Sequence, residues 1–322
     1  MERELAMELV RVTEAAAVSS ARLMGRGEKD LTDQLAVDAM RASFDVVNID
    51  GTVVIGEGEL DEAPMLYIGE HVGAGGVAVD VAVDPVEGTN LVAKGLNGAI
   101  AVVAIAPRGH LLHAPDMYMK KMAVGPDAKG CIDIEASVTA NLRWVARAKG
   151  KDISDMTVVI MDRPRHTELI RECREAGARI KLITDGDVAP AVAAGIPETG
   201  IDMLLGIGGA PEGVLAAAAL KCLGGDMQAR LVPSNEEQAE RCKTMGLADP
   251  THVLTLEDLV KGDNVYFAAT GITEGDLLRG VRYYGNHTAR THSIALRRET
   301  GTIRFIEAFH RLDRKPNWNP KV

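Results

Sequence analysis

The chain has 322 residues, of which 46% are hydrophobic and 25% charged, and its formal net charge is −10. This length fits one large or two medium domains, and the hydrophobic content is enough for buried cores. The acidic balance and the lack of a long Lys/Arg block argue against binding to nucleic acid. Aromatic residues make up only 3% of the chain, and small and aliphatic residues dominate, as is typical of buried strands packed by helices in α/β proteins.

The cysteines and the hydropathy pattern predict a cytoplasmic protein. No CxxC pair occurs, so we expect reduced structural thiols at Cys131, Cys173, Cys222 and Cys242. The opening segment is acidic and amphipathic, without the apolar stretch of a signal peptide. No apolar run approaches the ~20 residues of a membrane span, so we expect no membrane partner.

The first half of the chain indicates helices and short strands. Leu5, Leu9, Val12 and Ala16 repeat with the helical period, which predicts a helix over residues 2–24. Thr32 is a candidate N-cap for the next helix. The other elements expected here are a helix over 32–45, strands over 52–55, 77–83 and 100–106, and a helix over 141–148.

The second half alternates strands and helices more regularly, which predicts βαβ units and a parallel sheet. In such sheets ligands bind beyond the carboxyl ends of the strands. A domain boundary is expected near Lys149-Gly150-Lys151. The predicted elements are strands over 157–161, 180–183, 201–205, 265–269, 291–296 and 303–309, and helices over 168–176, 188–194, 214–223 and 235–245.

The strongest functional signal is Asp84-Pro85-Val86-Glu87-Gly88-Thr89, at the end of the apolar strand over 77–83. Carboxylates bind hard divalent cations such as Mg²⁺ or Mn²⁺. The glycine lets the backbone approach a phosphate, and the threonine hydroxyl can position an attacking water. Asp-Pro and Glu-Gly also favour plain turns, but a turn needs neither the apolar strand nor the threonine. The motif therefore predicts a metal-assisted phosphate-ester hydrolase.

A second acidic turn, Gly56-Glu57-Gly58-Glu59-Leu60-Asp61, follows the short strand over 52–55. By itself this turn is typical of a solvated acidic loop. Crowded carboxylates repel one another, so a pair of divalent cations would explain two such clusters. Asp33 stands at the start of the second helix, where its spacing alone indicates a complement to the helix dipole and not a metal ligand.

Three further motifs follow strands of the second half. Gly206-Ile207-Gly208-Gly209-Ala210-Pro211-Glu212-Gly213 can cradle an anion at a helix start, and Glu212 is either a metal ligand or a dipole complement. Arg163-Pro164-Arg165-His166 is either a phosphate clamp or a charged loop. Asp185-Gly186-Asp187 is a metal site, a pair of acceptors for sugar hydroxyls, or a turn with an N-cap. The scarcity of other acids nearby favours sugar hydroxyls.

Together these motifs resemble those of class II fructose-1,6-bisphosphatases, which are lithium-sensitive, metal-dependent sugar phosphatases. The similarity runs from Met1 to at least Met245 and includes Ala63-Pro64-Met65-Leu66-Tyr67. The resemblance implies a layered α-β-α-β-α sugar-phosphatase fold, with two mixed sheets sandwiched by helices. It also implies an N-terminal α+β metal-binding domain, residues 1–153, and a C-terminal α/β substrate-binding domain, residues 154–322, with the active site between them.

The resemblance further implies a role for each site residue. Asp33 and Glu57 would hold one metal ion, Mg²⁺ or Mn²⁺, and Asp84, Glu87 and Glu212 would hold another. Thr89 would activate the water together with Asp61 or Glu59. The residues that would contact the sugar bisphosphate are Glu87, Gly88, Thr89, Tyr118, Arg163, Pro164, Arg165, Asp185, Gly186, Asp187 and Gly209. The wider superfamily has aspartates where Glu87 and Glu212 stand, which leaves the number of metals open.

The reaction expected from this resemblance is hydrolysis of the 1-phosphate of fructose 1,6-bisphosphate, a step of gluconeogenesis, in a cytoplasmic homodimer or homotetramer. Sedoheptulose 1,7-bisphosphate is an alternative or additional substrate, because one extra hydroxymethylene need only fit the pocket. A regulatory sugar-phosphate-binding protein without catalysis is the alternative of another class. The presence of Thr89, Asp61 and all the candidate metal ligands argues against it.

Overall fold

The computed structural model describes residues 4–56, 58, 66–244, 249, 251–315 and 318. The chain forms two compact units: unit 1 comprises Met1–Leu111 and Asp263–Val322, and unit 2 comprises Leu112–Gly262. The sequence suggested one boundary near residue 153, whereas the chain passes from one unit to the other after Leu111 and again after Gly262. The reason lies in strand pairing, because the strands after Gly262 complete the sheet that the first 111 residues begin.

Unit 1 contains a mixed sheet in the order β12-β13-β11-β4-β3-β1-β2, with β14 paired to β13. Only the β1–β3 pair is parallel among the strand pairs described for this sheet. The strands are β1 (Ile49–Ile55), β2 (His71–Val72), β3 (Val77–Glu87), β4 (Ile100–Pro107), β11 (Tyr266–Gly271), β12 (Arg282–Tyr284), β13 (Thr288–Arg297) and β14 (Thr302–Arg311).

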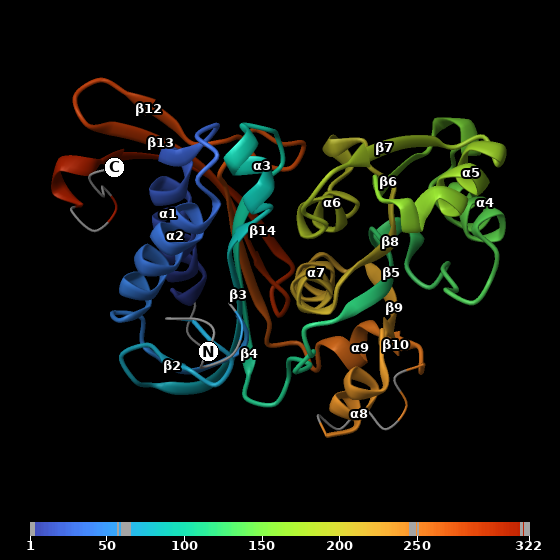
Figure 1. Cartoon of the computed structure of the whole chain (residues 1–322), viewed down its shortest axis with the longest axis horizontal. Coiled ribbons are helices and arrows are strands. Elements are labelled where there is room, and N and C mark those ends of the chain that lie inside the picture. The colour runs from blue at the N-terminus through green and yellow to red at the C-terminus, as the bar shows by residue number, and fades with distance from the viewer. Residues whose placement is uncertain are drawn as a thin grey trace. The chain divides into compact units, whose positions relative to one another are not determined.

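Two helices, α1 (Leu5–Ser20) and α2 (Lys29–Phe44), lie side by side on one face of this sheet (Figure 1). A 3₁₀ turn, η1 (Ala21–Leu23), extends α1, and α3 (Thr89–Lys94) and η6 (Leu312–Arg314) are short. Their apolar residues form one core with the strands that includes Leu9, Met40, Phe44, Val81 and Val103. Thr32 is not the N-cap of α2, because the helix begins at Lys29 and the Thr32 hydroxyl donates to the carbonyl of Glu28.

Unit 2 contains a second mixed sheet, in the order β10-β9-β5-β8-β6-β7. The expected parallel pairing of the βαβ strands is confirmed for β6 with β7 and for β6 with β8, while β5 and β9 add antiparallel pairs. The strands are β5 (Tyr118–Val124), β6 (Thr157–Met161), β7 (Arg179–Ile183), β8 (Met203–Gly209), β9 (Asp226–Val232) and β10 (Leu254–Thr255). The prediction of two mixed sheets packed by helices is therefore confirmed.

The helices of unit 2 pack on both faces of its sheet (Figure 1). α4 and α5 share a core with Met122 and Val124 of β5, whereas α7 approaches the neighbouring residues Met119 and Lys121 through Gly213. None of the helices in the described part of the chain is long and apolar enough to cross a membrane. The helices are α4 (Val138–Ala148), α5 (Thr167–Glu175), α6 (Val188–Ala193), α7 (Ala210–Leu223), α8 (Glu236–Thr244) and α9 (Leu256–Leu259), with 3₁₀ turns η2 (Pro126–Ala128), η3 (Ile153–Asp155), η4 (Pro164–His166) and η5 (Pro197–Thr199).

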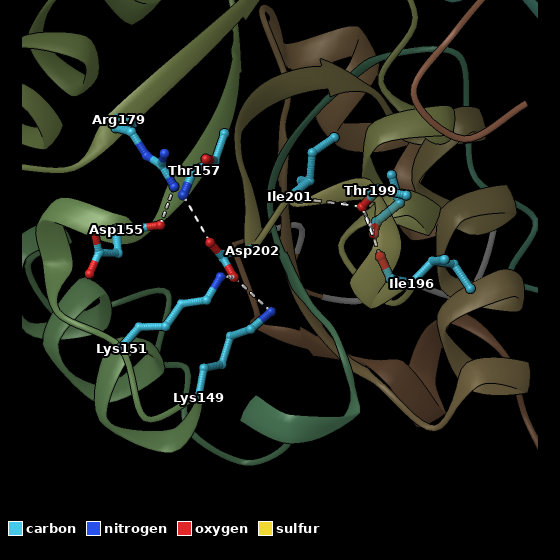
Figure 2. A network of polar contacts seen from close by, with 10 residues as sticks. Lys149, Lys151, Asp155, Thr157, Arg179, Ile196, Thr199, Ile201 and Asp202 are labelled. Carbon is cyan, nitrogen blue, oxygen red and sulfur yellow. Dashed lines mark hydrogen bonds and ion pairs between the residues drawn. The ribbon is translucent and has the colours of Figure 1, made fainter.

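A buried carboxylate joins three segments of unit 2. Figure 2 shows Asp202, just before β8, between Lys149 and Lys151 on one side and the start of β6 on the other. Asp202 Oδ1 lies 2.8 Å and 2.7 Å from the two ammonium groups, and the backbone N–H of Thr157 donates to Oδ2 at 2.9 Å. This network ties the chain after α4 to two central strands.

Candidate active site

A bulge in β3 places two of the candidate metal ligands on one face of the unit 1 sheet. Asp84 lies opposite Val102 of β4 and Glu87 lies opposite Ile100, with a register shift between them. Residues directly opposite each other share a face, and positions 100 and 102 lie on the same face of β4. The extra residue of the bulge therefore brings Asp84 and Glu87 to one face, although their spacing in a regular strand would separate them.

Gly88 and Thr89 turn the chain from this strand into a short helix. Gly88 has φ 94°, and a Cβ there would lie 2.9 Å from a methyl group of Leu91, so glycine suits this position on both counts. Thr89 is the first residue of α3, which packs on α2. The sequence motif is thus a strand end, a left-handed turn and a helix start in succession.

The structure brings Asp33 and Thr89 into direct contact. The Thr89 hydroxyl donates to Asp33 Oδ1 at 2.8 Å and also lies 3.2 Å from the carbonyl of Val86. Burial raises the pKa of Asp33, the bond from Thr89 lowers it and the neighbouring Asp30 raises it again, with a net upward shift. Asp33 lies in the second turn of α2 and not at its first residues, so it serves Thr89 more directly than it serves the helix dipole.

The three acidic residues of the predicted turn, Glu57, Glu59 and Asp61, fall outside the residues that the structure describes and stay predictions. Within the described ranges, no group of three or more His, Cys, Asp or Glu side chains is close enough to hold a metal ion. The candidate ligands that are described, namely Asp33, Asp84, Glu87 and Glu212, offer only carboxylate oxygens. That donor set suits Mg²⁺ or Mn²⁺.

In unit 2 the glycines of the loop between β8 and α7 make room for two carboxylates. A Cβ at Gly208 would collide with the carboxylate of Asp187, and a Cβ at Gly209 would collide with that of Glu212. Gly209 is the N-cap of α7, and Pro211 stands in the first turn, as the sequence predicts. The glycine-rich motif thus positions acidic side chains against the backbone.

Glu212 carries a buried carboxylate oxygen. Its Oε2 has no hydrogen-bond partner in the part of the chain that the structure describes. Burial raises the pKa of Glu212, whereas the nearby ammonium of Lys121 lowers it and Asp187 raises it further. An uncompensated buried carboxylate is costly, and a bound cation would remove that cost. This observation fits the predicted metal-ligand role of Glu212.

Tyr118 and Arg165 form the candidate phosphate contact of unit 2. The guanidinium of Arg165 lies over the Tyr118 ring, 4.7 Å from its centroid, and donates to the carbonyl of Ile207 from Nε at 3.1 Å and from Nη2 at 2.7 Å. Tyr118 begins β5 directly opposite Gly209. Three of the predicted substrate-binding residues, Tyr118, Arg165 and Gly209, are therefore brought together at the carboxyl end of β8.

Asp187 is buried and paired with a lysine that the sequence did not single out. Its Oδ2 lies 2.5 Å from Nζ of Lys121, while Oδ1 has no hydrogen-bond partner within the described ranges. Asp187 is the residue before α6 but does not cap that helix with its side chain. Asp187 therefore stands at the N-cap of α6, as one interpretation of the motif has it, while its side chain is engaged by Lys121.

His166 holds the segment that carries the arginines. Its Nδ1 lies 2.8 Å from the carbonyl of Met161, and its Nε2 accepts the N–H of Ile207 at 2.8 Å. This pattern requires a neutral ring protonated at Nδ1. Burial lowers the pKa of His166, in agreement with a neutral ring.

The other predicted substrate-binding residues of unit 2 lie in two turns, one after β6 and one after β7. Pro164 begins η4, and Arg163, directly before it, donates to the carbonyl of Asp162 at 3.4 Å. Gly186 has φ 73° and separates Asp185 from Asp187 in the turn before α6. Each turn follows the carboxyl end of a parallel strand, β6 or β7, which is where ligands bind in open sheets.

Comparison with known proteins identifies the family. The family model described as bacterial fructose-1,6-bisphosphatase, glpX-encoded, matches residues 3–310. Fructose-1,6-bisphosphatase 1 class 2 of Escherichia coli (strain K12) is 50% identical over 98% of this chain and 97% of its own. The D-fructose 1,6-bisphosphatase class 2/sedoheptulose 1,7-bisphosphatase of Synechococcus sp. (strain JA-2-3B'a(2-13)) is 48% identical over 97% of each chain. The chain therefore belongs to the bacterial, glpX-encoded fructose-1,6-bisphosphatase family.

Proposed function

We propose that this protein hydrolyses the 1-phosphate of fructose 1,6-bisphosphate, giving fructose 6-phosphate and phosphate in gluconeogenesis. The observation that carries the proposal is the cluster of Arg165, Tyr118, Gly209 and Asp187 around the carboxyl end of β8, in a chain of this family. A guanidinium binds phosphate, and a carboxylate binds sugar hydroxyls.

Divalent cations are part of the proposal. Asp33 and Glu57 would hold one ion, and Asp84, Glu87 and Glu212 would hold another, with Mg²⁺ or Mn²⁺ as the expected metals. Bound cations would polarise the phosphate oxygens, lower the pKa of a water and neutralise the leaving alkoxide. The buried, partnerless Oε2 of Glu212 and the all-oxygen donor set support this assignment.

Thr89 would orient the attacking water. Its O–H donates to Asp33, which leaves the lone pairs of the hydroxyl oxygen to accept a hydrogen bond from the water. Asp61 or Glu59 would take a proton from this water as general base when the water attacks the phosphate. Arg163 and Arg165 would anchor the phosphate that is not cleaved, with Pro164, Asp185, Gly186 and Gly88 shaping the pocket.

The direct test measures phosphate release from fructose 1,6-bisphosphate with Mn²⁺ or Mg²⁺, beside inositol monophosphate and a chelator control. Metal-dependent release from the sugar bisphosphate is the expected result. Release from inositol phosphate alone would overturn the substrate, and no release from either compound would favour the non-catalytic sugar-phosphate-binding protein. Asp84→Asn should abolish turnover with an unchanged circular dichroism spectrum, because a neutral amide binds a hard cation poorly.

A second substrate, sedoheptulose 1,7-bisphosphate, is favoured by one observation. The name of the Synechococcus relative, 48% identical to this chain, includes both bisphosphatase activities. The kcat/KM ratio for the two sugars, measured under identical metal conditions, decides between single and dual specificity.

We also propose that the protein is a homo-oligomer and that β14 contributes to the contact with a second copy. Among the described strands β14 pairs only with β13, so its outer edge is open to another strand. Ile303, Phe305 and Phe309 alternate along one face of β14 and are 44%, 47% and 65% exposed. An antiparallel copy of β14 would oppose these apolar residues with one another.

A further inference from the structure

Lys121 is a buried lysine among the candidate substrate-binding residues, and neither its sequence context nor the family resemblance marked it. It lies on β5, between β8 and β9, and is 2% exposed. Its neighbour Lys120 points to the opposite face and is exposed. Lys121 therefore faces α7, where the absence of a side chain at Gly213 leaves room for its stem. A buried ammonium is costly unless it is paired, so its partners define its role.

Lys121 has two partners, and each belongs to the candidate site. Its Nζ lies 2.5 Å from Oδ2 of Asp187 and donates to the carbonyl of Gly209 at 2.9 Å. The cavity beside these groups, lined also by Met161, His166 and Leu204, measures about 10 Å³, which leaves room for one water at most. The charge of Lys121 is thus met by protein groups and not by bulk solvent.

The two oxygens of the Asp187 carboxylate have different surroundings. Oδ2 is held by Lys121, and Gly208 gives it room because a Cβ there would collide with it. Oδ1 is buried, and no hydrogen-bond partner lies near it among the residues that the structure describes. Buried carboxylate oxygens normally accept hydrogen bonds, so Oδ1 can accept one from a bound ligand.

We propose that Lys121 is a positioning residue for sugar binding, an inference that rests on the proposed function. By fixing Asp187 Oδ2, it aims Oδ1 at a hydroxyl of the sugar. The carbonyl of Gly209 accepts the other hydrogen bond of Lys121 and keeps its ammonium in place. Lys121 itself does not touch the substrate.

The test compares KM, kcat and thermal unfolding for Lys121→Met, which keeps the length of the side chain and removes its charge. We expect KM for fructose 1,6-bisphosphate to rise about tenfold or more, equivalent to ~1.4 kcal/mol of lost binding, with a smaller change in kcat. Calorimetric binding of fructose 6-phosphate should weaken in parallel. Lys121→Arg keeps the charge, so its KM should lie between those of the wild type and Lys121→Met.

Lys221→Met is the matched control. Lys221 is another buried lysine of unit 2; it pairs with Glu257 and donates to the carbonyl of Val260 at 2.6 Å. Its removal should lower the melting temperature by a similar amount and leave KM unchanged. If Lys121→Met does not fold, Lys121→Arg and Asp187→Asn carry the comparison, since both keep a polar group at the pair.

A double variant separates positioning from packing. If Lys121 acts through Asp187, then KM of Lys121→Met/Asp187→Asn should equal that of Asp187→Asn within about twofold, because the effects of coupled residues are not additive. Additive effects, or a wild-type KM in a folded Lys121→Met, would overturn the inference while leaving the proposed reaction intact. A wild-type protein that releases no phosphate from fructose 1,6-bisphosphate would instead overturn both.

Discussion

The hydroxyl of Thr89, at the first residue of α3, donates a hydrogen bond to Asp33 on α2. Two residues separated by 56 positions in the chain thus form one polar unit. The bond fixes the direction of the Thr89 O–H, which defines where the oxygen can accept a hydrogen bond. Asp33 would therefore orient a water bound to Thr89 indirectly, by fixing the direction of the Thr89 hydroxyl.

Two replacements of Thr89 distinguish the role of its hydroxyl from the role of its side-chain shape. Thr89→Val should lower kcat by about 100-fold, in the range for loss of a group that assists proton transfer, because the isosteric side chain cannot accept a hydrogen bond from water. Thr89→Ser keeps the hydroxyl and should retain most of the activity. Steady-state kinetics at saturating metal checks both variants, and equal activity of the two would refute the water-orienting role.

Replacing Glu212 should lower kcat without lowering the melting temperature of the metal-free protein. In the presence of a chelator, Glu212→Gln should melt at or above the wild-type temperature, because burial disfavours the carboxylate, whose pKa is raised. With Mn²⁺ the wild type should gain stability by binding, and the variant should gain less and lose about 100-fold in kcat. Differential scanning calorimetry with and without metal tests this. A variant that is destabilised under both conditions would contradict a ligand role.

Stability should fall as the pH drops below the ordinary histidine range, because His166 is held neutral. Burial lowers its pKa in the folded state, below the 6.5 of an ordinary histidine. The unfolded chain therefore binds the proton more readily, and acidification from pH 7 to 5 favours unfolding. His166→Gln should lessen this dependence of the melting temperature on pH. His71→Gln, at a ring that is 72% exposed, is the control and should leave the profile unchanged.

The Asp202 network of Figure 2 should contribute strongly to the stability of unit 2. Burial raises the pKa of Asp202, but its bonds from Lys149, Lys151 and Thr157 together outweigh burial and lower it. Asp202→Asn should cost about 3 kcal/mol, because it removes a buried charge from its partners. Lys151→Met should cost less, since that ammonium is partly exposed. Urea unfolding monitored by circular dichroism measures both, and equal losses would argue against the central role of Asp202.

A charge on the exposed face of β14 should break the contact with a second copy. Phe309→Glu should weaken association by a factor of about 30 or more, as expected for loss of a central aromatic contact worth ~2 kcal/mol. Val46→Glu places the same charge at another exposed apolar residue and should leave the molecular mass of the oligomer in solution unchanged. Light scattering across a concentration series checks this. A wild-type protein that is monomeric at all concentrations would refute the proposed interface.

Periodicity predicted most elements that are strongly apolar or strongly amphipathic. The strand over residues 157–161 is β6 to the residue, and the bounds of α5 and β4 differ from the prediction by one residue. β5 and β9 were missed. In β9 the buried residues Met227, Ala229 and Leu231 alternate with polar ones, which is a strand pattern that sequence rules recognise. β5 carries two adjacent lysines, which suggest a solvated segment.

Sequence motifs identified most candidate site residues of unit 2, but they did not predict which side chains those residues contact. Tyr118, Arg165 and Asp187 come from three different segments, and only strand pairing brings them together. Lys121 was missed because a lysine usually indicates an exposed position. The adjacent Lys120 was a usable signal, because neighbouring residues of a central strand point to opposite faces. The bulge at Asp84 depends on pairing with β4, and its signal in the sequence is Pro85, because proline within a central strand is found at bulges.

The insertion of unit 2 between two halves of unit 1 sets an order for folding during synthesis. β4 needs β11 as its neighbour, and β11 is made only after all of unit 2. Unit 2 can therefore complete its sheet while the first strands of unit 1 still present an unpaired edge to solvent or to a chaperone. Joining those halves closes a loop of some 150 residues, and long-range pairing of this kind is slow. We expect unit 1, which carries Asp84 and Thr89, to be the last part of the enzyme to mature.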